Sequence, residues 1–344
     1  MSSHRGGCSV AKIHFTQAMN QALEAAMEED DTVIVLGEDI DVSVFGVTKG
    51  LIDRFGANRI RKTPISEATF VGSAVGAAAS GLRPFAHVMF SSFFYVAMDQ
   101  IANQAARLRY MSGGQVELPI VYFAGTGLSG SAAAQHSENP HSILMHIAGL
   151  KVVMPSTPHD AKGLMLAAIR DPNPVVFLSD LRLSGRRGEV PEDAYEIPLG
   201  EADIKRQGED VTVVAIASLV HLALEVAEKL EHEGISVEVV DPRSLVPFDW
   251  DTVVGSVRKT GRLVVADPAR RLCGTAAEVV AGVTDRAWDS LLSQPQRVTW
   301  PDIPVPFSPS LEAALDIGAE DLMAAIRTTL AGSSRRAATV ATGD

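Results

Sequence analysis

Short runs rich in β-branched residues alternate with helix-like segments along this chain, and that alternation constrains the fold more than any other feature. The runs are nearly continuous in apolar residues, which is typical of strands buried on both faces of a parallel sheet. Seven runs have this character: residues 32–36, 120–123, 151–154, 175–178, 211–216, 237–240 and 263–266. The sequence therefore predicts an α/β fold with parallel sheets covered by helices.

The 344 residues are enough for two domains. Residues 183–200 combine the sequence SGRRG with two prolines and several acids and show little periodicity, so we expect an interdomain linker with the boundary near residue 190. The expected domains are residues 12–190 and 200–330. Residues 332–344 are mostly small or basic, and we expect them to form a disordered tail.

Two segments have helical character. Residues 71–80 are small, with Gly72 and Gly76 four positions apart, and residues 94–110 carry apolar side chains at helical spacing. Core packing is the simpler explanation of both segments, and a subunit interface is the alternative. The sequence leaves these alternatives open.

Charge and cysteine content exclude several classes of protein. The net charge is −12, and the body of the chain has no lysine- or arginine-rich run, so nucleic acid and anionic membrane are poor partners. The apolar stretches are interrupted by Gly, Ser or charge, so none is expected to span a bilayer, and no secretory signal is visible. The two cysteines have neither disulfide nor metal spacing. A reducing cytoplasm is the expected location.

Two polar residues stand in distinctive surroundings. Glu67 follows Pro64 and Ser66 and begins a Gly/Ala-rich helical segment, where an acid at a helix start interacts favourably with the helix dipole. His136 follows a glycine-rich loop, so it is either an acid–base group in a cleft or a surface histidine. Taken singly, neither residue identifies a function.

Aromatic residues cluster at residues 90–95, in a chain that is only 6% aromatic. Core packing is the simple explanation, and a flat wall for a heterocyclic ring is the functional alternative.

Taken together and in order, the motifs of this chain resemble the β subunits of E1 components of pyruvate, branched-chain 2-oxoacid and acetoin dehydrogenases, from about residue 12 to 330. The matching segments are GED at 37–39, GVTKGL at 46–51, TPISE at 63–67, GLRP at 81–84, YMSGG at 110–114, AQHS at 134–137, residues 140–150, KVVMPS at 151–156, DAKGL at 160–164, AIRD at 168–171 and PVPFSP at 304–309. The resemblance implies a thiamine-diphosphate-binding pyrimidine-type domain with a parallel sheet, followed by a transketolase C-terminal-like α/β domain.

The same resemblance implies that this chain is half of an enzyme. In the family, α and β subunits form an α2β2 assembly, and the α chain holds the diphosphate and Mg²⁺ through a Gly-Asp-Gly…Asn motif. That motif is absent from the printed sequence. The expected cofactors are therefore thiamine diphosphate and Mg²⁺ held mainly by an α partner. The expected acyl acceptor is the lipoyl domain of an E2 component or another carrier protein.

The resemblance assigns roles by position. Glu67 matches the glutamate that hydrogen-bonds the aminopyrimidine ring and promotes proton loss at the thiazolium C2. His136 matches the histidine that faces substrate and lipoyl group. Phe93 matches the ring that stacks on the pyrimidine, and Glu38 and Met89 complete the expected cofactor contacts. In some relatives the backbone holds a potassium ion, and the matching positions here are Ile120, Ala168, Ile169, Asp171 and Asn173.

Four positions depart from the family pattern. Phe123 replaces a usual arginine, and three residues replace common acids: His87, Ser179 and Pro268. These changes alter the electrostatic field of the expected substrate site. The donor therefore stays open among pyruvate, a branched-chain 2-oxoacid, acetoin and a ketose phosphate. A specialised relative that makes a two-carbon unit for a biosynthetic carrier is an alternative, and so is a non-catalytic assembly subunit. Retention of Glu67 and His136 argues against the last.

Overall fold

The structure is a computed structural model that describes residues 9–341, with side chains described as far as residue 332. The chain forms two compact units, and each is described by itself. The first comprises residues 9–125 and 147–199, and the second comprises residues 126–146 and 200–341 of the described chain. The chain thus leaves the expected first domain at residue 126 and returns at residue 147.

The first unit is built on a sheet whose strands run in the order β6-β7-β5-β4-β2-β3. The pairs β2–β3, β2–β4, β4–β5 and β6–β7 are parallel. The strands are β2 (Val33–Gly37), β3 (Ile60–Lys62), β4 (Arg83–Phe90), β5 (Val121–Thr126), β6 (Lys151–Val153) and β7 (Val175–Asp180). The predicted parallel α/β fold is confirmed.

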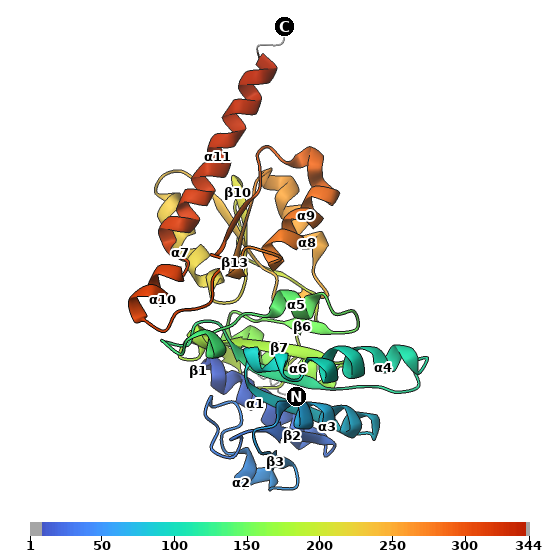
Figure 1. Ribbon diagram of the computed structural model, residues 1–344. Coiled ribbons are helices and arrows are strands. Elements are labelled where there is room, and N and C mark those ends of the chain that lie inside the picture. The colour runs from blue at the N-terminus through green and yellow to red at the C-terminus, as the bar shows by residue number, and fades with distance from the viewer. Residues whose placement is uncertain (1–8, 342–344) are drawn as a thin grey trace, which may run out of the picture. The chain divides into compact units, whose positions relative to one another are not determined.

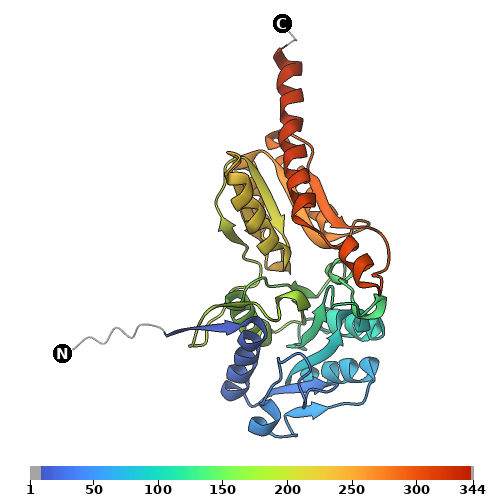
Figure 2. The same ribbon diagram turned by 90° about the vertical axis from the view of Figure 1, so that its left-hand side faces the viewer.

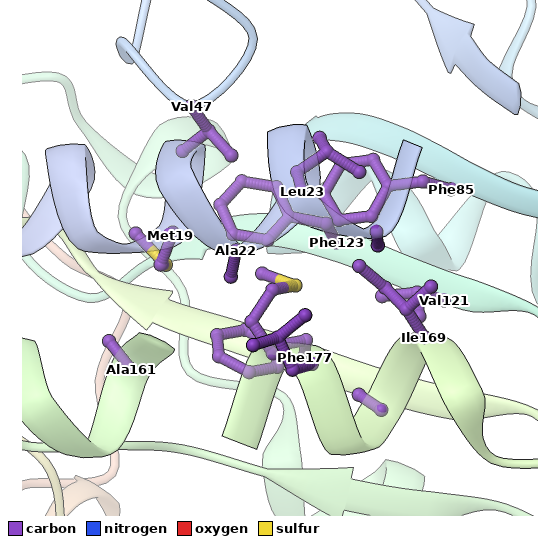
Figure 3. Packing of buried hydrophobic residues seen from close by; sticks show 14 of the residues in the cluster. Met19, Ala22, Leu23, Val47, Phe85, Val121, Phe123, Ala161, Ile169 and Phe177 are labelled. Atoms are coloured by element: carbon purple, nitrogen blue, oxygen red, sulfur yellow. The ribbon is translucent and has the colours of Figure 1, made fainter. Parts of the chain in front are cut away.

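Helices cover both faces of this sheet. The helices α1 (Phe15–Glu29) and α6 (Pro158–Arg170) pack against one face, and Figure 3 shows Met19, Ala22 and Leu23 of α1 meeting aromatic side chains of the strands. The helix α3 (Glu67–Ala79) lies on the opposite face (Figure 2). Smaller helices are α2 (Leu51–Phe55), α4 (Ala106–Met111) and the 3-10 turns Ser91–Tyr95 and Leu181–Leu183.

Two sequence expectations for this unit differ from the structure. Residues 94–110 are not one helix: the 3-10 turn Ser91–Tyr95 is followed by a π-helix, Gln100–Ala105, and then by α4. The expected linker is also partly ordered, because its strand β8 (Arg187–Pro191) pairs antiparallel with β1 (Val10–His14). Buried Lys162 reinforces this pairing, since its ammonium donates to the carbonyls of Pro191 and Glu192 at 2.6 and 2.9 Å.

The second unit is a sheet with strand order β14-β13-β10-β11-β9, parallel except for β9. The strands are β9 (Asp203–Arg206), β10 (Val211–Ala215), β11 (Val237–Asp241), β13 (Leu263–Arg270) and β14 (Gln296–Trp300), with the short β12 (Ser244–Val246) between β11 and α8 in the chain. Figure 1 shows α7 (Leu219–Glu231) and α11 (Ala319–Ala341) on one side of the sheet and α8 (Trp250–Thr260) and α9 (Thr275–Ala287) on the other. Each face buries its own apolar cluster.

The remaining helices of the second unit are short. They are α5 (His141–Met145), α10 (Pro309–Leu315) and the 3-10 turns Ala134–His136 and Trp288–Ser290. The helix α11 continues to Ala341, so it includes ten of the residues expected to form a disordered tail. Alanine and arginine, which favour helices, are frequent there. Residues 342–344 lie outside the described part of the chain.

Candidate active site

The polar and aromatic residues singled out in the first unit gather near the carboxyl ends of neighbouring strands. Glu38 follows β2 directly, and Met89 and Phe90 end β4, which pairs with β2. Gly37 permits the close approach of these strands: it has a φ of +152°, and a Cβ there would lie 2.4 Å from the carbonyl oxygen of His87. Open parallel sheets bind ligands at this edge, so the placement favours a ligand site.

Glu38 is the most unusual acid in this unit. Its side chain is buried, and its Oε1 atom has no hydrogen-bond partner among the described residues. Burial raises the pKa of its carboxyl group, and the nearby charges of Glu67 and Asp39 raise it further. A hydrogen bond from the Ser66 backbone opposes this rise. A buried carboxyl group of this kind is suited to hold a proton or to bind a polar heterocycle.

Glu67 is the first residue of α3, and it is close enough to Glu38 for its charge to raise the pKa of that carboxyl group. Its side chain is half-buried, and Ser66, which precedes the helix, makes no side-chain cap to the backbone. Glu67 can therefore still stabilise the start of α3 by interacting with the helix dipole. The finding that separates a catalytic role from this one is the neighbouring buried carboxyl of Glu38, because helix stability does not require two adjacent acids.

Aromatic rings line the same strand end. Phe90 makes edge-on contacts with Phe93, at 5.7 Å between ring centroids, and with Phe45, at 5.3 Å. Phe93 and Met89 are both half-buried. Phe90 belongs to the aromatic cluster noted in the sequence, whereas Phe45 was not expected here, since only the fold brings residue 45 to this strand. Carboxyl groups beside rings are the chemistry that binds an aminopyrimidine, so this chain fits the pyrimidine half of thiamine diphosphate.

His136 belongs to the second unit. It ends the 3-10 turn Ala134–His136 with an exposed side chain, and Ser129 donates a hydrogen bond to its carbonyl oxygen at 2.9 Å. Both Ser131 and Ala133 have positive φ angles of 63° and 62°, which side-chain-bearing residues rarely adopt. The turn that presents His136 is therefore held in an uncommon conformation by its surroundings.

Comparison with known proteins identifies the family. A transketolase pyrimidine-binding domain model matches residues 11–184, and a transketolase C-terminal domain model matches residues 200–322. The β subunit of acetoin:2,6-dichlorophenolindophenol oxidoreductase from Cupriavidus necator is 48% identical over 333 residues, which cover 93% of this chain and 98% of that one. This chain belongs to the E1 β-subunit family of acetoin and 2-oxoacid dehydrogenases.

Two further matches agree with this membership. The β subunit of the pyruvate dehydrogenase E1 component from Bacillus subtilis is 42% identical over 302 residues, covering 87% of this chain and 93% of the relative. A solved structure described as a split-gene transketolase, inactive β4 tetramer, is 25% identical, with a TM-score of 0.75 and coverage of 94% of this chain and all of that one. The expected two-domain fold of an E1 β subunit is thereby confirmed.

The departures of this E1 β chain lie inside its units rather than on their surfaces. Phe123 is 1% exposed, and its ring lies 5.1 to 6.1 Å from the rings of His87, Phe85 and Phe177 (Figure 3 shows the three phenylalanines). His87 and Ser179 are also buried. Burial lowers the pKa of His87 to about 4, so this histidine is neutral at physiological pH. Phe123 and His87 thus belong to an uncharged, closely packed cluster.

The expected potassium loop is crowded with hydrogen bonds. The carbonyl of Ile120 accepts from the Val175 N–H at 2.8 Å, and the carbonyl of Ile169 accepts from the Arg83 guanidinium at 3.1 Å. The backbone N–H of Asn173 donates to the Asp171 carboxylate at 2.9 Å, and Ala168 is buried within α6. An arginine already donates to a carbonyl of this loop, so the hydrogen bonds do not point to a potassium ion. The potassium assignment stays a prediction.

Neither a metal-binding cluster of side chains nor a membrane-spanning helix is found among the described residues. Residues 9–341 contain no group of three or more His, Cys, Asp or Glu side chains arranged to hold a metal ion. Within the same residues, no helix has both the length and the apolar character needed to cross a bilayer.

Proposed function

We propose that this chain is the β subunit of a heteromeric, thiamine-diphosphate-dependent E1 enzyme that is active only with an α partner. It would cleave the carbon–carbon bond next to a carbonyl in acetoin or a 2-oxoacid. The observation that carries the proposal is the interaction of buried Glu38 with Glu67, at strand ends that also carry clustered aromatic rings, in a chain that belongs to this family. Bound thiamine diphosphate supplies the electron sink that such a cleavage requires.

The residues of the first unit would bind and orient the pyrimidine ring. Glu67 would share a proton with that ring and so promote proton loss at C2 of the thiazolium. Phe93 would stack on the ring, Met89 would contact it, and the unpartnered Oε1 of Glu38 would accept a polar contact from the bound ring. Mg²⁺ and the diphosphate would be held mainly by the α chain, in an α2β2 assembly.

The second unit would serve acyl transfer. In this step the acyl carbon would form a thioester with one sulfur of a lipoyl disulfide and its bond to the cofactor would break, while the disulfide bond would break and the other sulfur would take a proton. The acyl unit is oxidised by two electrons as the disulfide is reduced. His136, exposed at the end of its turn, would donate that proton or stabilise the developing charge.

Sequence identity favours acetoin over pyruvate as donor. The two acetoin-oxidising relatives are 46% and 48% identical to this chain, whereas the pyruvate dehydrogenase relatives are 41–44% identical.

A donor screen tests the proposal. The chain is co-expressed with its α partner, and the purified complex is assayed with acetoin, pyruvate, branched-chain 2-oxoacids and ketose phosphates, using 2,6-dichlorophenolindophenol as the electron acceptor. We expect turnover with acetoin to exceed that with pyruvate at equal concentration, and no turnover with either subunit alone. Dye reduction by the β chain alone would contradict the proposal, and so would an α/β complex inert to every donor.

A further inference from the structure

The segment that carries His136 is tied to the second unit immediately after that residue. The carboxylate of Glu138 forms an ion pair with Arg270, whose Nη2 lies 3.4 Å from Oε2. Asn139 donates its side-chain amide to the carbonyl of Pro268. The segment 126–146 is thereby fixed to the end of β13, about 130 residues further along the chain.

The most deeply buried of these ties is a histidine–aspartate pair. Nε2 of His141 lies 2.8 Å from Oδ1 of Asp267, and both side chains are completely buried. The second carboxylate oxygen of Asp267 accepts the backbone N–H of Ala276 at 3.0 Å, in the first turn of α9. Both oxygens of Asp267 are therefore used, and His141 is joined through it to a strand end and a helix start.

Asn139 binds the backbone carbonyl of Pro268 at an irregular point of the sheet. The register between β13 and β14 shifts between Asp267 and Arg270, so the Pro268 carbonyl lies at an irregularity of the ladder. The Asn139 amide supplies a donor to this carbonyl, while its Oδ1 accepts from the Thr126 hydroxyl at 2.5 Å. Position 268 thus holds the loop through a contact of its backbone carbonyl.

We infer that His141, Asp267 and Asn139 form a clasp that sets the position of His136 for acyl transfer. The inference rests on the role proposed for His136. Four residues separate His136 from His141, and three of them, Ser137, Glu138 and Asn139, have hydrogen-bond or ion-pair partners in the second unit. A displacement at position 141 therefore moves His136, whereas cofactor contacts in the first unit are made by other segments. The three clasp residues are positioning residues, not catalytic ones.

The test compares two reactions on the same preparation of the α/β complex. Reduction of 2,6-dichlorophenolindophenol needs the cofactor and donor, and acylation of a lipoylated lipoyl domain needs acyl transfer as well. The ratio of the two rates is independent of how much enzyme is folded. For His141→Leu we expect the ratio of lipoyl acylation to dye reduction to fall roughly 10- to 100-fold, as a displaced transfer group predicts.

Three further variants make the test specific. His141→Gln keeps an N–H donor toward Asp267 and should hold the ratio within about threefold of wild type. His146→Leu, a change at an exposed histidine of the same segment, should leave the ratio unchanged. His136→Ala should lower the ratio at least as far as His141→Leu. Hydrogen exchange of residues 127–141, followed by mass spectrometry on the complex, should accelerate in His141→Leu and not in His141→Gln.

The outcomes separate two failures. If His136→Ala lowers the ratio and His141→Leu does not, the clasp is overturned and the proposed function stands. If His136→Ala leaves the ratio unchanged, the proposed role of His136 fails and the inference fails with it. If both rates of His141→Leu fall by the same factor, the pair only stabilises the fold, and the positioning role is overturned.

Discussion

In the α/β complex, Glu67→Gln slows hydrogen–deuterium exchange at C2 of bound thiamine diphosphate by roughly 10²- to 10⁴-fold, the usual cost of losing a positioned proton-transfer group. Glutamine keeps the shape and one hydrogen bond of Glu67 but cannot share a proton with the pyrimidine ring. The affinity for the cofactor should therefore change little. The exchange is read by acid-quenched NMR over a series of times.

A helix-dipole role for Glu67 predicts a different result: a loss of roughly 0.3–1 kcal/mol of stability with near-normal exchange. Glu278→Gln is the matched control, because Glu278 is an exposed acid in the first turn of α9. It should show the small stability loss alone. An exchange rate in Glu67→Gln within about threefold of wild type would remove this residue from the mechanism.

The second large effect concerns the buried cluster around Phe123. Phe123→Arg places a charge among Phe85, His87 and Phe177, all of which are buried. An unpaired buried charge costs roughly 3–5 kcal/mol. We therefore expect Phe123→Arg to lower the unfolding temperature of the chain by about 10 °C or more, at roughly 2–4 °C per kcal/mol for a unit of this size.

A double variant separates charge burial from a packing defect. Ser179 lies two residues beyond Phe177 on β7, which neighbours β5 in the sheet, so Ser179→Glu offers a partner to the new arginine. We expect the double variant to recover about 1 kcal/mol or more relative to Phe123→Arg alone. Phe123→Leu, which adds no charge, should cost roughly 1 kcal/mol. If Phe123→Arg is as stable as Phe123→Leu, the cluster is not the closed apolar environment that the structure describes.

The sequence predicted the fold well where local pattern decides it. All seven predicted strands form, because uninterrupted β-branched runs have few alternatives to a sheet buried on both faces. The central strand β4 was missed, since Arg83, Pro84 and His87 interrupt its apolar character. The helix expected at residues 94–110 is broken by a π-helical turn that side-chain spacing cannot indicate.

Long-range contacts account for the rest. No local signal places residues 126–146 in the second unit, because their anchors at Asp267, Pro268 and Arg270 are distant in sequence. The same limit applies to the positions at which this chain departs from the family pattern. Resemblance locates Phe123, His87 and Ser179 as unusual positions, but only packing shows that they are buried. Likewise, only the structure shows that Glu38 is buried close to Glu67, which strengthens its assignment to the cofactor site.

The central claim is that this chain holds the pyrimidine side of a cofactor site and needs an α partner for the rest. Isothermal titration of thiamine diphosphate and Mg²⁺ into the β chain alone, and into the α/β complex at the same β concentration, tests it most directly. We predict at most weak binding to β alone and a tight, Mg²⁺-dependent signal of one cofactor per αβ pair in the complex. Tight, stoichiometric, Mg²⁺-dependent binding to the β chain alone would contradict the claim.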